Sequence, residues 1–410
     1  MKRFVSIAVS VLLACSLLVS CGKEQTNEDQ DTVSQMELVQ EVPAERIAHE
    51  TITPATGFSG GDGTKEAPYE ISTAADLQYF ANLFYGFQFG EGENINTHAR
   101  KYQEAYYVLT NDIFVNTDAE MENADVKAPT YKWEAVGRTT DDAAVQHMGF
   151  QGHFDGQNHF ISGLYYCTLG DDYGMPDGTI GFFALLQDAT VCNLTIRNSY
   201  FYVYNFTNSI GGLASSAADS YIYNCHCEDV KIYAHSSNGT AALVGSTVST
   251  ANISNCTVSG EVRGGYSSDI GGITSNVGDG LIANCTNNAS IVSFENAIAG
   301  GICCTASDVA AAGSIESQNP AQNHGKTQIT GCINNGTVTS ESFGAGGITA
   351  RANSGKASVL ISACKNNGTI RGNNEVGGIV GTLYAEKAEQ IMRLNESEAF
   401  WSKIVRMSEK

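Results

Sequence analysis

The strongest constraint on this fold is a repeat of about 30 residues in the second half of the chain. One position recurs at steps of 30, 31, 31, 29, 47 and 32 residues, at Leu164, Leu194, Cys225, Cys256, Cys285, Cys332 and Cys364. A second position follows at steps of 30, 30, 29, 46 and 31, at Gly212, Ala242, Gly272, Gly301, Gly347 and Gly378. Fixed periods of this length are typical of solenoids. Both ladders lengthen at the same step, so an insertion near residues 307–325 interrupts one repeat.

Each repeat holds three short runs rich in Ile, Val and Thr and separated by Gly, Asn or Asp. In one repeat these runs are 270–274, 280–285 and 289–293. Their composition is typical of strands, and none is long enough for a helix. Three strands per coil, with coils stacked about 4.8 Å apart, make a parallel β-helix. The sequence therefore predicts an all-β fold, a parallel β-helix of about seven coils with three short strands per coil, between residues 164 and 384.

In a parallel β-helix the laddered cysteines point inward and stack on one another. Stacked neighbours have parallel Cβ directions, which is poor disulfide geometry, so we expect buried free thiols that behave as small apolar groups. Disulfides remain the alternative in an exported protein. Cys303 and Cys304 are adjacent, so one should face in and the other out. Cys227 should share the face of Cys225. No spacing indicates a metal site formed by cysteines.

The N-terminus indicates export. Lys2 and Arg3 precede an apolar stretch, 4–19, which is too short to span a bilayer but typical of a signal peptide. Residues 18–21, Leu-Val-Ser-Cys, resemble the bacterial lipobox, which implies removal of residues 1–20 and lipid on Cys21. The alternative is an ordinary secretory signal with an incidental cysteine. Gly22 stands where some retained lipoproteins have Asp, which favours an outer-membrane, cell-surface location.

The composition limits the classes of partner that we expect for this protein. The chain has a formal net charge of −21, which argues against nucleic acid and anionic membrane surfaces as partners. It suits a self-repelling surface protein, expected to be a monomer without a cofactor. Residues 21–56 are rich in Gln, Glu, Asp, Thr and Ser, which predicts a flexible tether between lipid and domain. No second apolar run reaches about 18 residues, so no transmembrane helix is predicted.

Residues 57–163 predict a small α/β cap in front of the coils. A turn signal at 60–64 precedes a short strand at 67–72. Residues 73–83 predict a helix, with Thr73 as its N-cap and Asp76 at the third helical position. A further strand is predicted at 106–113.

The cap motifs resemble a known family. The runs FSGGDGT, PYEISTAADL, YYVLTNDI, WEAVG and FQGHFDGQNHFISGL occur in this order, and the succession resembles proteins that carry the GLUG motif. Over residues 57 to 382 the resemblance implies a right-handed parallel β-helix on a secreted or surface-bound protein, often a Bacteroidetes lipoprotein. The name motif is divergent here: 181–184 is Gly-Phe-Phe-Ala, 211–214 is Gly-Gly-Leu-Ala, and only 378–381, Gly-Ile-Val-Gly, keeps both glycines.

The end of the chain predicts a cap of a different kind. Residues 385–410 are rich in Glu and Lys, and their apolar residues recur at helical spacing. A helix here would cover the open strand edges at the end of the β-helix. The alternative is a disordered tail.

Catalytic motifs of β-helix enzymes are incomplete. Asn116-Thr117-Asp118 and Asp171-Asp172 do not share a strand face, Gly152-His153-Phe154 lacks a second Gly, and basic residues are scattered in the repeats. Asp62, Asp112 and Asp155 are interpreted as turn and cap residues, with Ca²⁺ binding or catalysis as the alternative. His153 and His159 flank Asp155 without forming a recognised metal motif. No catalytic or metal residue is therefore assigned.

These observations favour a non-catalytic adhesin or binding module for a glycan or a host protein. Tyr200, Tyr202 and Tyr204 fall at period two, so they form either an exposed stripe that stacks sugar rings or a strand packed under the insertion. The competing class is a carbohydrate-active β-helix enzyme, a polysaccharide lyase or glycoside hydrolase. A cluster of Asp or Glu with Lys or Arg on one outer β-face would favour it. The third class is a structural spacer, favoured by a featureless surface.

Overall fold

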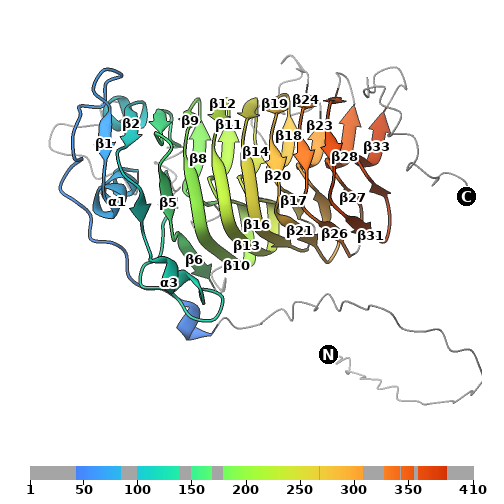
Figure 1. The fold of residues 1–410 in the computed structure, drawn as a ribbon, viewed down its shortest axis with the longest axis horizontal. Helices are drawn as coiled ribbons and strands as arrows, with labels where there is room; N and C mark the ends of the chain where they lie inside the picture. The colour runs from blue at the N-terminus through green and yellow to red at the C-terminus, as the bar shows by residue number, and fades with distance from the viewer. Residues whose placement is uncertain are drawn as a thin grey trace, which may run out of the picture. The chain divides into compact units, whose positions relative to one another are not determined.

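The computed structural model describes residues 43–84, 99–137, 149–168, 179–266, 268–307, 327–341, 343–354 and 359–385. The signal peptide, Cys21, most of the insertion and residues 386–410 lie outside this range. Three parallel sheets run side by side along the length of the described region (Figure 1). No described helix is long and apolar enough to cross a membrane.

Sheet I has nine strands: β1 (Tyr69–Ile71), β2 (Tyr106–Leu109), β4 (His153–Asp155), β9 (Thr190–Cys192), β12 (Ser220–Tyr223), β15 (Ala251–Ser254), β19 (Leu281–Ala283), β24 (Thr327–Thr330) and β29 (Val359–Ser362). Sheet II has seven: β8 (Phe183–Gln187), β11 (Ala214–Ala218), β14 (Val244–Thr247), β18 (Thr274–Gly278), β23 (Cys303–Ser307), β28 (Thr349–Ser354) and β33 (Val380–Ala385).

Sheet III contains the remaining strands. They are β3 (Ile113–Phe114), β5 (Phe160–Ser162), β6 (Tyr165–Thr168), β7 (Thr179–Ile180), β10 (Thr195–Gly211), β13 (His226–Ala241), β16 (Thr257–Gly264), β17 (Asp269–Gly271), β20 (Thr286–Asn287), β21 (Ser290–Ser293), β22 (Ile298–Gly300), β25 (Ile333–Asn334), β26 (Val338–Ser340), β27 (Ala345–Gly346), β30 (Lys365–Asn366), β31 (Ile370–Gly372) and β32 (Val376–Gly377).

The chain passes from sheet II to sheet I to sheet III in each coil, which confirms the parallel β-helix. There are about six complete coils, one fewer than the seven predicted, because Leu164, taken as the first ladder position, lies beside Ser199 in the strand register and not beside Leu194. The ladder position follows a corner at which Asn193, Asn224, Asn255 and Asn284 have φ near +53°. Asn tolerates this left-handed conformation better than most residues, which explains the repeated Asn-Cys pairs.

The described cysteines are free, as the stacking geometry predicts. Cys225, Cys256, Cys285 and Cys332 are fully buried, and each thiol donates to the carbonyl two residues before it, as Cys256 does to Ser254 at 3.2 Å. Burial raises the pKa of the Cys225 thiol, so this thiol is protonated and chemically unreactive.

Cys303 and Cys304 do point to different sides. Cys303 joins the main core, whereas Cys304 packs in a separate small cluster with Ile298 and Ala350. Both are nevertheless fully buried, so the outward thiol is covered rather than exposed.

The insertion leaves the stacking of coils intact. Its flanking residues, Ser307 and Thr327, lie at the ends of β23 and β24, and the Thr327 hydroxyl donates to the Ser307 carbonyl. Strand β24 still pairs in register with β19. A loop whose ends are held together adds length at little cost to the coil.

The N-terminal strands continue the coils. Strands β1, β2 and β4 belong to sheet I, and one hydrophobic core runs from Tyr69 to Ile361. Helix α1 (Ala74–Leu83) begins where predicted: Thr73 accepts from the Asp76 N–H, and Asp76 accepts from the Thr73 N–H, which is a capping box. The helix buries Leu77 and Phe80 against the end of the core. A π-helical turn, η2 (Ala99–Gln103), and helix α3 (Asp118–Met121) complete the cap.

The predicted tether must be shortened. Residues 43–56, assigned to it on composition, pack against the fold. The 3-10 turn η1 (Ala44–Arg46) is followed by a bridge between Glu50 and Tyr131, and the Ala55 N–H donates to Ala75. These backbone bonds replace water as partners of the segment, which composition alone does not predict.

The far end of the described region is more exposed. Val376 and Leu383, in the last strands, are 44% and 41% exposed, and Ile370 and Ile379 are half-buried. The covering helix predicted at 385–410 falls outside the described residues from residue 386 onward and stays a prediction.

Candidate functional site

The predicted tyrosine stripe on β10 is largely covered. Tyr200 and Tyr202 are 3% and 5% exposed, so neither is free to stack a sugar ring. The segment around Arg46 covers them. The Arg46 guanidinium donates to the Tyr200 hydroxyl at 2.5 Å and lies 4.5 Å from the ring centroid of Tyr202. The exposed-stripe prediction is therefore wrong for these two residues, because a segment about 150 positions away occupies their face.

Arg46 is itself held by a third tyrosine. The Tyr165 hydroxyl donates to the Arg46 carbonyl at 2.5 Å, and the rings of Tyr165 and Tyr200 stack at 5.6 Å. Burial raises the pKa of both phenols, so they stay protonated and keep these hydrogen bonds across the working pH range. We refer to residues 43–50, pinned by Arg46, as the strap.

Tyr204 differs from its two neighbours. It is half-buried and its ring stacks on His235 of the next coil at 5.1 Å, which in turn lies 6.3 Å from Tyr266. Tyr266 is 61% exposed. Tyr204 thus starts a short aromatic ladder across coils rather than a stripe along one strand, and its contact with a ligand stays a prediction.

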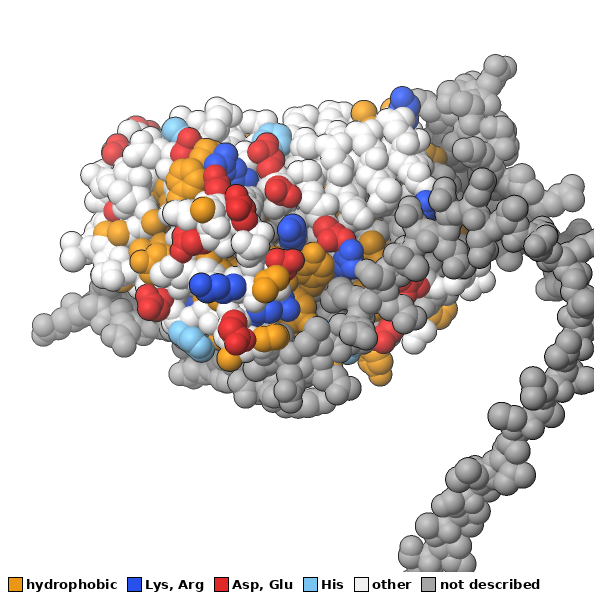
Figure 2. Space-filling view, turned by 60° about the horizontal axis from the view of Figure 1, so that its bottom comes forward, with side chains coloured by type: hydrophobic (Ala, Val, Ile, Leu, Met, Phe, Trp, Pro, Cys, Tyr) orange, Lys and Arg blue, Asp and Glu red, His pale blue; other side chains and the backbone are white. Residues whose placement is uncertain are grey.

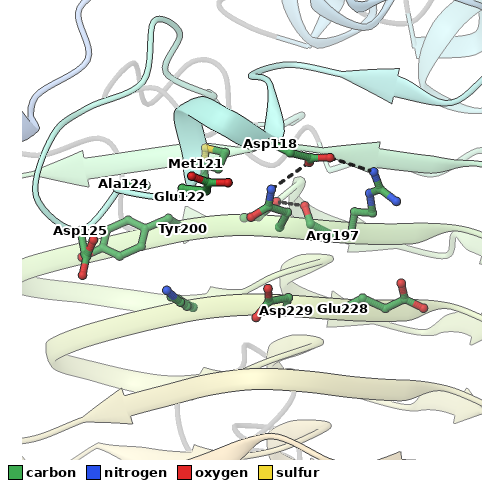
Figure 3. Close-up of a pocket in the computed structure, with 12 residues that line it drawn as sticks. Asp118, Met121, Glu122, Ala124, Asp125, Arg197, Tyr200, Glu228 and Asp229 are labelled. Atoms are coloured by element: carbon green, nitrogen blue, oxygen red, sulfur yellow. Dashed lines mark hydrogen bonds and ion pairs between the residues drawn. The ribbon is translucent and has the colours of Figure 1, made fainter.

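A charged cleft lies beside the covered tyrosines. Its volume is about 490 Å³, and it opens between α3 with its following loop and the outer face of β10 and β13 (Figure 3). The lining residues are Asp118, Met121, Glu122, Ala124, Asp125, Arg197, Asn198, Ser199, Tyr200, Glu228, Asp229 and Lys231. Acidic and basic side chains intermingle over this N-terminal part of the molecule (Figure 2).

The fold positions these groups from two sides. Helix α3 is capped by Thr117 and Glu120, which sets Asp118 at the cleft edge. On the floor, Asn198 and Asp229 have φ of +44° and +54°, and these irregular positions interrupt the strand alternation. Such bulges re-aim neighbouring side chains, and they are frequent beside functional sites.

Asp118 and Arg197 are engaged with each other across the cleft. Their closest atoms are 3.4 Å apart, and Asp118 also accepts from Asn198 at 2.9 Å and Ser162 at 3.2 Å. The Arg197 guanidinium stacks 3.6 Å from the ring centroid of Phe160. Among the described residues, the side chains of Glu122, Glu228 and Lys231 make no hydrogen bond or ion pair. These three groups are available to a ligand, as are the carboxylates of Asp125 and Asp229, which also make no side-chain hydrogen bond or ion pair among the described residues.

Asp62 and Asp155 accept from nearby backbone N–H groups, as the turn interpretation predicts, whereas the backbone partner of Asp112 lies 48 residues away. Asp62 accepts from the Thr64 N–H and hydroxyl, and these bonds lower its pKa. Asp155 accepts from the Gln157 N–H, and Asp112 accepts from the Phe160 N–H. Of the two histidines, only His153 lies near Asp155, because His159 pairs with Asp112 at 3.0 Å. No cluster of three metal-ligating side chains occurs among the described residues.

Sequence reasoning missed most of the cleft. Glu228, Asp229 and Lys231 follow the buried Cys227 on a strand, so alternation hinted at an outward charged face. No local sequence pattern indicates that these residues lie near Asp118, which occurs in the sequence only as part of an incomplete hydrolase motif. Asp171 and Asp172 from the same comparison lie outside the described residues. Arg46 lies in the segment predicted to be a tether, so nothing in the sequence indicates that it contacts Tyr200.

The fold and the site together define a parallel β-helix protein with a solvent-exposed charged cleft on one sheet. No protein-family model matches the chain. It is 32% identical to Halomucin of Haloquadratum walsbyi over 148 residues, 36% of this chain and 1% of Halomucin. It is 27% identical over 160 residues to the "Putative Gly-rich membrane protein" of Evansella cellulosilytica, 39% of this chain and 14% of that protein. The chain thus matches only a small part of either relative.

Among solved structures, the chain resembles one described as "a putative immunoglobulin A1 protease from Bacteroides ovatus". The TM-score is 0.44 at 18% identity, and the match covers 78% of this chain and 87% of that one.

Proposed function

We propose that this protein is a lipoprotein, anchored through Cys21 at the cell surface, whose β-helix is a non-catalytic binding module for a glycan or a host protein. The observation that carries the proposal is the charged cleft on sheet III. Its floor is formed by the long strands β10 and β13, and the cleft side chains of Glu122, Glu228 and Lys231 have no hydrogen-bond or ion-pair partner among the described residues. Preformed clefts with a few convergent polar groups are where ligands bind by default.

The charge of the cleft favours ligands rich in hydrogen-bond donors. Five carboxylates line it against two cations, Arg197 and Lys231, and Arg197 is already paired. Ionised carboxylates only accept hydrogen bonds. Sugar hydroxyls and the Lys or Arg side chains of a protein supply such donors, whereas a polyanion would be repelled. Glycan and protein ligands therefore both fit, and a sulfated or phosphorylated polymer does not.

A carbohydrate-active enzyme is the second candidate, and the same cleft favours it. Carboxylates with Lys231 and Arg197 share one outer β-face, which is the arrangement that would indicate an enzyme. Against it, Asp118, Glu122, Asp125, Glu228 and Asp229 are all exposed, whereas a glycosidase general acid acts from an enclosed, apolar position. The spacer alternative is the weakest of the three, because the surface is not featureless.

The test is a glycan-array and depolymerisation assay on the chain from Gly22 onward, with and without Ca²⁺. The cleft variant is Glu228→Gln with Lys231→Met. The matched control is Glu341→Gln with Lys365→Met, exposed positions just after β26 and on β30 of the same sheet. Binding without cleavage, weakened in the cleft variant and intact in the control, supports the proposal.

Other outcomes of this test would change the proposed function. Cleavage of any polymer, abolished in the cleft variant, would establish the enzyme instead. Binding that is equal in both variants would remove the cleft from the function. If no glycan binds, the same variants are compared for binding to host extracellular proteins, and failure there too would leave the spacer.

A further inference from the structure

A second surface, on sheet I, carries exposed aromatic residues that the cleft does not involve. On β12, Tyr221 and Tyr223 point outward on either side of the buried Ile222 and are 57% and 39% exposed. Neither ring stacks on another aromatic ring among the described residues. Two exposed tyrosines on one strand of a stable sheet are a rigid, amphipathic surface of the kind enriched at binding hot spots.

The same face continues toward the N-terminal end of the sheet. Tyr106 of β2 pairs with His153 of β4, and their rings lie 5.4 Å apart. His153 and Tyr221 are both paired with Thr190 of β9. Tyr106 and Tyr221 are thus three strand spacings apart, roughly 14 Å. The labels of β2, β9 and β12 lie along one edge of the molecule (Figure 1).

A hollow of about 350 Å³ opens at the Tyr106 end. Lys65, Tyr106, His153, Asp155 and Gln157 are among its lining residues. Both oxygens of Asp155 are oriented by hydrogen bonds, one to the Gln157 N–H and the other to its side-chain amide at 2.7 Å. The hollow therefore holds fixed polar groups next to an aromatic ring.

Cys192 of β9 lies between the two ends of this surface, in register with Asp155 of β4 and Tyr223 of β12. Its sulfur lies 4.0 Å from Nε2 of His153, and it accepts from the Asn193 amide at 3.6 Å. A hydrogen bond with Cys192 is the first cause that raises the pKa of Tyr223 to about 12, so this phenol is neutral at pH 7. Burial lowers the pKa of His153, which keeps its imidazole neutral as well.

The rest of sheet I adds no charge to this face. The outward positions of the strands from β9 to β29 are Thr190, Cys192, Tyr221, Tyr223, Asn252, Ser254, Leu281, Ala283, Gln328, Thr330, Leu360 and Ser362. None is ionised at pH 7, in a chain of net charge −21. From β9 onward this face is thus an uncharged strip on an acidic protein, which matches a ligand without charge, and Asp155 and Lys65 are charged groups at the hollow end.

We propose that the outer face of sheet I between β2 and β12 binds a neutral oligosaccharide laid across the strands. The faces of Tyr221 and Tyr223 pack on the C–H faces of the sugar rings, since pyranose rings have apolar faces and polar rims. In the hollow at the other end, the Asp155 carboxylate accepts hydrogen bonds from sugar hydroxyls, and the Gln157 side-chain amide donates hydrogen bonds to them. A polymer with a regular repeat suits a surface whose own strands repeat every 4.8 Å or so. This site is separate from the charged cleft, and either can exist without the other.

Affinity electrophoresis of the chain from Gly22 onward tests the proposal. The gels contain neutral polysaccharides (starch, galactomannan, β-glucan) or anionic ones (polygalacturonate, hyaluronan). The variant is Tyr221→Thr with Tyr223→Thr, which keeps strand propensity. The control is Tyr266→Asn, an exposed tyrosine at φ +44° away from sheet I, where Asn tolerates the backbone. Thermal unfolding of each variant checks folding.

The expected result is retardation by at least one neutral polymer, weakened about tenfold or more in the double variant, as for a hot-spot residue, and unchanged in Tyr266→Asn. Retardation by anionic polymers alone, or by none, overturns the proposal. So does neutral-polymer binding that survives the double variant. The cleft variant Glu228→Gln/Lys231→Met should leave this binding intact, which separates failure of this site from failure of the cleft.

Discussion

The two ends of sheet I fill the same inward position in different ways. In register along the sheet, the first three strands place Tyr69, Tyr107 and Phe154 in the core. Five successive strands further on all place isoleucine there: Ile222, Ile253, Ile282, Ile329 and Ile361. Val191, on β9, marks the change.

The difference follows from what lies beside each strand. A middle coil has a coil on both sides, so one β-branched side chain per strand is enough to fill the narrow interior. The first strands form the end of the stack and need a larger volume filled. Phe154 there lies 5.7 Å from the ring centroids of Phe80, Phe182 and Phe183, and helix α1 closes the end. One sheet therefore supports an aromatic terminal core and a layered aliphatic one.

The largest effect is expected in the aromatic core. Phe154→Ala removes a fully buried ring from a cluster of aromatic side chains that cannot easily collapse, and it should cost about 3–5 kcal/mol of unfolding free energy. Chemical denaturation of wild type and variant measures it. Phe114→Ala, at a ring that is 45% exposed, is the control and should cost far less. Equal losses would mean that the terminal core is not the stable part of the cap.

The reverse exchange tests the layered core. Ile282→Phe puts an aromatic ring between Ile253 and Ile329, which occupy the adjacent coils, and overpacking should cost about 1–3 kcal/mol. The conservative Ile282→Val should cost about 0.5–1.5 kcal/mol. If the coil accepts phenylalanine without loss in denaturation experiments, the contrast between the two cores reflects sequence history rather than available volume.

A substitution at Arg46 tests whether its side-chain contacts hold the strap against the outer face of β10. Arg46→Ala leaves the buried hydroxyl of Tyr200 without the partner that it has now, and should cost about 1–2 kcal/mol. The effect should be local, so limited proteolysis within residues 43–50 and hydrogen exchange there are the measurements. Arg46→Lys keeps the charge but not the planar stacking on Tyr202, so protection of residues 43–50 should lie between that of the wild type and that of Arg46→Ala. Unchanged protection in Arg46→Ala would show that backbone bonds alone hold the strap.

The smallest effect is expected at the exposed cap of α3. Hydrogen bonds from Thr130 and Thr117 lower the pKa of Glu120 from 4.5 to about 2. A depressed carboxyl pKa stabilises the folded state above the unfolded value, and that contribution is lost as pH falls from about 4.5 towards 2. Because Glu120 is only half-buried and its bonds are screened by solvent, Glu120→Gln should cost under about 1 kcal/mol at pH 7. Denaturation at pH 7 and pH 3 should show the difference shrinking at the lower pH; a constant difference would contradict it.

Much of the fold was predictable because it repeats. The period near 30 residues predicted the stacked coils. The longer step to Cys332 indicated where the insertion lies. Thr73 and Asp76 indicated where α1 begins. These features depend on inward and outward alternation and on local hydrogen bonds, which neighbouring residues specify. The inward cysteines followed from the same alternation. The coil count was too high by one, because Leu164, taken as the first ladder position, lies beside Ser199 in the register of the strands and not beside Leu194.

The candidate sites were not predictable in the same way. Alternation places Tyr200, Tyr202, Tyr221 and Tyr223 outward alike, yet the first two are buried and the last two are exposed. What decides is whether a distant segment covers them, and the bond from Arg46 to Tyr200 joins residues 154 positions apart. The sequence by itself determined which side of each strand faces the core. Only the tertiary structure decided which outer faces stay open, because covering an outer face requires contacts that no local pattern records.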